Sequence, residues 1–150
     1  MKKIAIVVAL AAVLLIPATA GAKTKVRFAH YAGTASPAGV VSFNMATIKQ
    51  RHKKARRLIG NFTFDGIPVT CADGPHVTQG HLTFAVKLLG GHFNMLASNS
   101  VTGAILAIHG TVAGPASGTI QVDGNVPIDA SSNLGSDCHS GALNWTASRT

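Results

Sequence analysis

The sequence contains no glutamate, and its only acidic side chains are those of five aspartates. Catalysis by a pair of carboxyl groups would therefore have to use two of these five. Asp65, Asp73 and Asp123 each precede a glycine, a combination typical of turns. Asp129 and Asp137 lie in a polar stretch near the end of the chain. We therefore expect no carboxylate-based active site.

Other catalytic and metal-binding motifs are also missing. No Gly-x-Ser-x-Gly segment occurs, so nothing marks a serine as a nucleophile. The seven histidines show no His-x-Glu or His-x-x-x-His spacing, so we expect neither a metal site nor a cofactor, although a site built from distant histidines stays an alternative. The stretch from Asp123 to Asp129 offers oxygen ligands for Ca²⁺, but its spacing is not that of an EF-hand, and an Asx-rich turn is the simpler interpretation.

Residues 1–22 have the composition of a secretory signal peptide. Two lysines precede the apolar run Ile4–Ile16, and small residues after it offer A-x-A cleavage sites. The run is shorter than the about 20 residues that a membrane-spanning helix needs. We expect cleavage after Ala22, or as a second choice after Ala20. The mature chain, 23–150, would then be one secreted or extracytoplasmic domain without a transmembrane anchor.

Only two cysteines are present, Cys71 and Cys138. In an exported domain they most simply form one disulfide, and closing a loop of this length stabilises by about 4 kcal/mol in the chain-entropy model. Two free thiols, or a nucleophile formed by Cys138 and His139, are the alternatives. Neighbouring residues on a strand point to opposite faces, which disfavours that Cys-His pair.

Glycine and β-branched residues outweigh strong helix formers, and alternating apolar positions recur between turn residues. We predict about eight strands, at residues 24–31, 39–46, 58–64, 81–89, 92–98, 102–112, 118–123 and 142–148. This pattern predicts an all-β fold, a single antiparallel β-sandwich or barrel with one disulfide.

The details of four of these strands can be predicted as well. In 58–64, Leu58 and Phe62 should share one face and Ile59 should take the other, before Asp65 and Gly66 form a turn.

Segment 102–112 is so apolar that it should be central and covered on both faces, unless it is a buried helix. In 39–46, Val41, Phe43 and Met45 should share one face. In 142–148, Leu143, Trp145 and Ala147 should point inward. Residues 67–80 and 123–137 are predicted loops.

Gly90 and Gly91 have the composition of a two-residue hairpin turn. With these glycines as the turn, 81–89 would pair with 92–98 and every second pair would be apolar. The predicted pairs are Leu89 with His92, Leu88 with Phe93, Val86 with Met95, and Phe84 with Ala97.

Short segments resemble those of small exported bacterial all-β domains of unassigned function. They are Gly39-x-Val41-Ser42-Phe43, Phe62-x-Phe64, Gly118-Thr119-Ile120-x-Val122 and Cys138-x-Ser140-Gly141-x-x-x-Trp145-x-Ala147-x-Arg149. The resemblance covers most of the mature chain and implies the fold class and secretion. It implies no catalytic residues, and this chain is poorer in lysine and richer in histidine than those domains.

Residues 49–57 break the apolar pattern with a run of cations. The candidate polyanion-binding residues are Lys49, Arg51, Lys53, Lys54, Arg56 and Arg57. An exposed hairpin tip with this charge could contact an anionic cell-surface polymer or polysaccharide, or it could simply be solvated. Nucleic acid is a less suitable partner, because no aromatic residue lies between Phe43 and Phe62 to stack on bases.

These observations favour an exported, non-enzymatic binding or structural module. The alternative is a small secreted hydrolase whose site is assembled from histidines and aspartates on loops.

Overall fold

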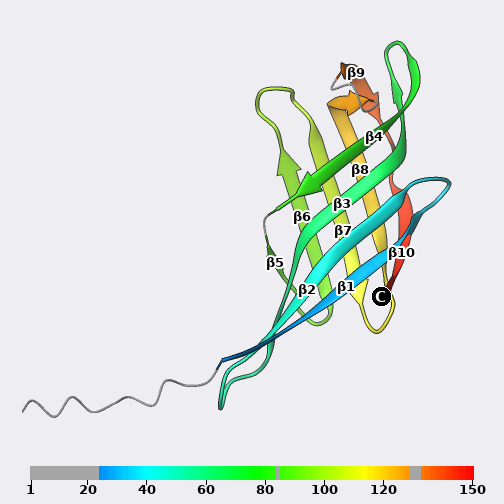
Figure 1. Ribbon diagram of the computed structural model, residues 1–150. Helices are drawn as coiled ribbons and strands as arrows, with labels where there is room; N and C mark the ends of the chain where they lie inside the picture. Colours follow the sequence, from blue (N-terminus) through cyan, green and yellow to red (C-terminus); the bar gives the residue numbers. More distant parts are fainter. Residues whose placement is uncertain (1–23, 84, 129–132) are drawn as a thin grey trace, which may run out of the picture.

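The computed structural model describes residues 24–83, 85–128 and 133–150, and these form strands without any helix (Figure 1). It follows that no helix in the described ranges could span a membrane. The predicted signal peptide lies outside them. The strands are β1 (Lys25–Ala35), β2 (Val40–Lys49), β3 (Arg56–Cys71), β4 (Gly74–Leu82), β5 (Val86–Lys87), β6 (His92–Ser98), β7 (Ile105–Val112), β8 (Ala116–Ile128), β9 (Asn133–His139) and β10 (Leu143–Arg149).

The strands form two layers. In the front layer β1, β2, β3 and β4 pair in that order, and the short β5 pairs with the start of β3. In the back layer β6, β7, β8 and β10 are neighbours, and the front strands cross them obliquely (Figure 1). Strand β10 also pairs with β1 and so joins the layers along one side. The predicted all-β, sandwich-like fold is confirmed, with ten described strands instead of about eight.

Five aromatic rings fill the space between the layers. Phe43 stacks on Tyr31 and Phe62, with ring centroids 4.9 and 5.8 Å apart. The indole of Trp145 meets the edges or faces of Phe43, Phe62 and Phe93 at 5.9 to 6.2 Å. The shared face predicted for Val41, Phe43 and Met45 is confirmed and is the inner one, and the inward orientation predicted for Trp145 is confirmed as well.

The face prediction for β3 was wrong on one side of a bulge. Ile59 is fully buried, whereas Leu58 faces the other way. The register with β2 shifts at Asn61, which is exposed and has a φ of 50°. This extra residue changes the alternation, so Phe62 and Phe64 point inward together with Ile59.

Asp65 and Gly66 do not end the strand as predicted. They form a second irregularity, where Gly66 has a φ of 67°, and β3 continues to Cys71. Ile67, Val69 and Cys71 are buried beyond it. The predicted loop 67–80 is therefore mostly the β3–β4 hairpin.

The predicted polar loop 123–137 is also largely paired. Strand β8 continues to Ile128, and β9 returns beside it, with Pro127 opposite Leu134 and Gly124 opposite Cys138. The sequence predicted a loop here because most residues of these two segments are polar. Only a few of their side chains, such as those of Val126 and Cys138, are buried.

The predicted glycine turn is confirmed, but the predicted hairpin is wrong. Leu89 and His92 exchange backbone hydrogen bonds of 2.9 and 3.0 Å across Gly90 and Gly91. Beyond that pair the two segments separate, because β5 pairs with β3 and β6 pairs with β7. The turn therefore carries the chain from the front layer to the back layer. The predicted pair that includes Phe84 lies outside the described residues.

Strand β6 finds a better apolar partner in β7, where Met95 lies opposite Ile108 and both are buried. The strand β7 is central, as predicted, but only one of its faces is covered. Leu106, Ile108 and Val112 are buried, whereas Ile105 is 46% exposed. The interior of this sandwich lies on one side of each layer, so even a very apolar strand has an outer face.

Candidate functional site

The β2–β3 hairpin has the cationic tip that the sequence predicts. Strand β2 ends at Lys49, β3 begins at Arg56, and the intervening turn contains a hydrogen bond of 3.2 Å from the Lys53 N–H to the Gln50 carbonyl. His52 adopts a left-handed backbone conformation in this turn. All six predicted cations are exposed: Lys49, Arg51, Lys53, Lys54, Arg56 and Arg57.

Strand β1 adds two cations that the sequence did not assign to the site. Lys25 lies directly opposite Lys49, and Arg27 lies opposite Thr47, whose other neighbour is Arg57. The start of β1, the end of β2 and the start of β3 project together past the back layer (Figure 1). We call the eight residues the cationic tip: Lys25, Arg27, Lys49, Arg51, Lys53, Lys54, Arg56 and Arg57. If β1 and β2 are predicted to form an antiparallel hairpin, the start of β1 lies beside the end of β2. This pairing is the signal that could have assigned Lys25 and Arg27 to the site.

The charge of the tip is not neutralised by the protein's own carboxylates. Every ion pair among residues 24–83, 85–128 and 133–150 joins a histidine to an aspartate. Asp65 lies opposite Val40 at the far end of the β2–β3 ladder, and the other described aspartates are on the β3–β4 turn, β8 and β9. Like charges placed directly opposite each other, such as Lys25 and Lys49, destabilise a ladder. An external anion would relieve this repulsion.

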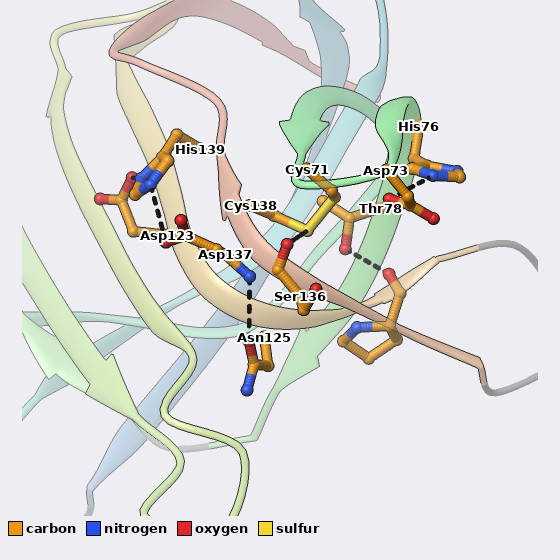
Figure 2. Close-up of a disulfide and its surroundings, with 11 residues drawn as sticks. Cys71, Asp73, His76, Thr78, Asp123, Asn125, Ser136, Asp137, Cys138 and His139 are labelled. Atoms are coloured by element: carbon orange, nitrogen blue, oxygen red, sulfur yellow. Dashed lines mark hydrogen bonds and ion pairs between the residues drawn. A yellow bond between two sulfur atoms is a disulfide. The ribbon is translucent and has the colours of Figure 1, made fainter.

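The opposite end of the molecule holds the disulfide. Cys71, at the end of β3, is bonded to Cys138 in β9, as predicted, and both are buried (Figure 2). Gly135 packs against the bond so closely that a Cβ there would lie 2.7 and 2.8 Å from the two sulfur atoms. The pair does not leave a thiol for the Cys138–His139 nucleophile that was the alternative.

His139 lies between two carboxylates beside the disulfide. Its Nδ1 is 3.0 Å from Oδ1 of Asp123, and its Nε2 is 3.3 Å from Oδ1 of Asp137 (Figure 2). The hydrogen bond with Asp123 is the largest of the causes that raise the pKa of His139 above its usual 6.5. Desolvation, the next largest effect, lowers this pKa, and the contact with Asp137 raises it again. The site therefore favours the imidazolium form.

This arrangement does not have the geometry of a hydrolase. A histidine that activates a serine needs one ring nitrogen free to accept the hydroxyl proton, but both nitrogens of His139 face carboxylates. The neighbouring Ser140 hydroxyl instead donates to the Gly141 carbonyl at 2.7 Å and accepts from the Val122 N–H at 2.8 Å. These contacts fasten β8 to the segment after β9.

The remaining histidines are distributed over several surfaces. On the outer face of the back layer, His109 is 2.8 Å from Asn94 and His92 is 2.9 Å from Thr111. His30 pairs with Asn44 across β1 and β2 at 2.9 Å. Among the described residues, no three histidine, cysteine or acidic side chains lie close enough together to hold a metal ion.

Where the candidate calcium stretch is described, its side-chain oxygens form hydrogen bonds within the protein. The Asn125 side chain accepts a hydrogen bond of 3.0 Å from the Asp137 N–H, and Asp123 accepts one of 2.7 Å from Gln121 as well as contacting His139. Asp129 lies outside the described residues. These oxygens stabilise the β8–β9 pairing.

A cavity of about 250 Å³ lies where β4 passes over the back layer. Its lining includes Phe64, Leu82, Leu106 and Val122. The buried hydroxyl of Thr78, also in the lining, donates to the Pro127 carbonyl at 2.7 Å. The cavity is smaller than the about 300–1,000 Å³ of typical ligand pockets.

Comparisons with protein-family models, curated proteins and solved structures find no match to this chain. The candidate function therefore depends on the geometry and charge of its own residues.

Proposed function

We propose that the protein is an extracytoplasmic, non-enzymatic binding module that contacts anionic cell-surface polymers through the cationic tip. The observation that carries this proposal is the gathering of eight exposed cations from three strands and the β2–β3 turn at one end of the front layer, without a described aspartate among them. Lysine and arginine on a projecting hairpin can follow a flexible anionic chain without a preformed pocket. The net charge favours the same class of partner: it is +8 for the whole sequence and +6 without Lys2 and Lys3 of the predicted signal peptide.

The disulfide supports the proposed compartment, because such bonds persist mainly in oxidising environments. Among the described residues, no ion pair joins a cation of the tip to an aspartate, so the charges of the tip are available to a ligand.

The test is retention on immobilised heparin and dextran sulfate as model polyanions. Replacing Arg51, Lys53 and Lys54 with serine removes charge from the turn without touching a strand. At about 1 kcal/mol for each cation near an anionic surface, affinity should fall by about 100-fold, and replacing all six predicted cations should abolish salt-sensitive retention.

A charge-matched control separates local binding from net charge. Ser98, Ser100 and Ser148 are exposed and distant in sequence from the tip, and changing each to aspartate lowers the net charge by the same three units. This control should keep most of the heparin affinity. Equal losses in both triple variants would show that only net charge matters and would overturn the proposal.

A further inference from the structure

The outer face of the front layer carries an apolar strip beside the cationic tip. Phe28 lies opposite Ala46, which lies opposite Leu58, and Val26 lies opposite Ile48. Residues directly opposite each other share a face of the sheet, so these five side chains are neighbours. We call them the apolar strip: Val26, Phe28, Ala46, Ile48 and Leu58.

The strip faces away from the core. The next residues along the strands, Ala29, Met45 and Ile59, pack inward. The side chain of Phe28 is 74% exposed and that of Val26 is 45% exposed. A hollow of about 210 Å³ lies on this face, with Phe28 and Leu58 among its lining residues.

Cations border the strip on its own face. Ile48 lies opposite Arg56, and Leu58 lies opposite Lys87 in β5. The other face of the same three strands carries Lys25, Lys49 and Arg57. The projecting end of the front layer therefore combines an exposed aromatic and aliphatic surface with positive charge on both sides.

A soluble polyanion would use the cations but would leave Phe28 in water. A bilayer with anionic headgroups uses both features, because the headgroup charge attracts the cations and the interfacial region accepts apolar side chains. We propose that the protein docks on anionic lipid membranes with its cationic tip, inserting Phe28 and the adjacent part of the apolar strip into the headgroup region. This inference rests on the proposed function, since the same cations supply the attraction.

The test is co-sedimentation of the full chain with vesicles. Phosphatidylcholine vesicles containing about 30% phosphatidylglycerol should bind the protein at low salt, and pure phosphatidylcholine vesicles should not. Phe28→Ser should weaken binding to the anionic vesicles by about tenfold or more, because it removes the largest inserted side chain. Phe28→Leu should keep most of the binding.

Leu96 provides a matched control. It is also 74% exposed, but it lies on β6 in the back layer, away from the cationic tip. Leu96→Ser should leave vesicle binding unchanged, and both serine variants should keep wild-type retention on heparin. Equal circular dichroism spectra and melting temperatures would verify that each variant is folded.

Three results would overturn the inference or its basis. Retention on heparin without binding to anionic vesicles would refute membrane docking and leave the polymer-binding proposal intact. Vesicle binding that is equally sensitive to Phe28→Ser and Leu96→Ser, or sensitive to neither, would refute insertion of the apolar strip. Binding to neither heparin nor anionic vesicles would refute both proposals.

Discussion

Trp145 contacts three other aromatic rings of the described core, and it does so from β10, the last described strand. Its side chain is 1% exposed and touches Phe43 and Phe62 from the front layer and Phe93 from the back layer. No acceptor for its indole N–H lies among the described residues. The residue therefore stabilises by apolar contact, and a binding role at the surface is excluded.

Trp145→Ala should lower the free energy of unfolding by about 3–5 kcal/mol, because it leaves a large cavity between the layers. Trp145→Phe should cost less, since it keeps one ring and does not break a hydrogen bond. Urea denaturation followed by circular dichroism would measure both values. Equal losses for the two variants would contradict this explanation, because phenylalanine fills part of the cavity that alanine leaves empty.

Single residues also explain where sequence patterns fail. Alternation predicted which residues share a face in β2 and which point inward in β10, because these strands keep a constant period of two. In β3, Asn61 inserts one residue and reverses the pattern on one side. Since a bulge depends on the paired strand as well as on its own residues, the pattern of one strand does not reveal it.

At the level of elements, β8 and β9 are joined by side chains as well as by their ladder. His139 of β9 contacts Asp123 of β8, and Asn125 of β8 accepts from the backbone of Asp137. Both His139 contacts strengthen when the imidazole is protonated. The pairing of these strands should therefore depend on pH.

The pKa of His139 is raised in the folded protein, so its contribution to stability is fully present below about pH 6.5. The contribution is lost as the pH rises through the higher folded value. An NMR titration should place the His139 midpoint above 6.5, and Asp123→Asn should lower it more than Asp137→Asn does. A wild-type midpoint at or below 6.5 would contradict this prediction.

Pairing between elements was harder to predict than the elements themselves. The turn predicted at Gly90 and Gly91 is present in the structure. The residues of a turn do not reveal, however, that the strands on its two sides, β5 and β6, belong to different layers. The loops predicted from polar composition proved to be strands for a similar reason. Backbone pairing with β3 and β8 holds β4 and β9 in place although few of their side chains are buried.

At the scale of the whole molecule, the disulfide joins two distant parts of the chain at the end opposite the cationic tip. Cys71 and Cys138 are 67 positions apart and connect β3 with β9. The sequence predicted this pairing from composition and compartment. It also predicted the six cations of the β2–β3 hairpin. The two cations of β1 and the apolar strip come together only through the register of β1, β2 and β3, which the pattern of a single segment does not show.

Reducing the disulfide, or replacing both cysteines with alanine, should lower the free energy of unfolding by about 4 kcal/mol. Chemical denaturation with and without reductant would measure this loss, with the double variant as the control that reductant should not affect. The intact mass under non-reducing conditions should be about 2 Da below the reduced mass. Two free thiols in the native protein would contradict the bond.

The position of β10 has a consequence for the order of folding. Its residues lie between β1 and β8, with Arg149 opposite Tyr31 and Leu143 opposite Ile120. The ladder between the layers, and the indole that fills the space beneath it, are contributed by a strand that follows both of its neighbours in the chain. During synthesis the sandwich therefore cannot close before β10 has emerged, and β1 keeps an open edge until then.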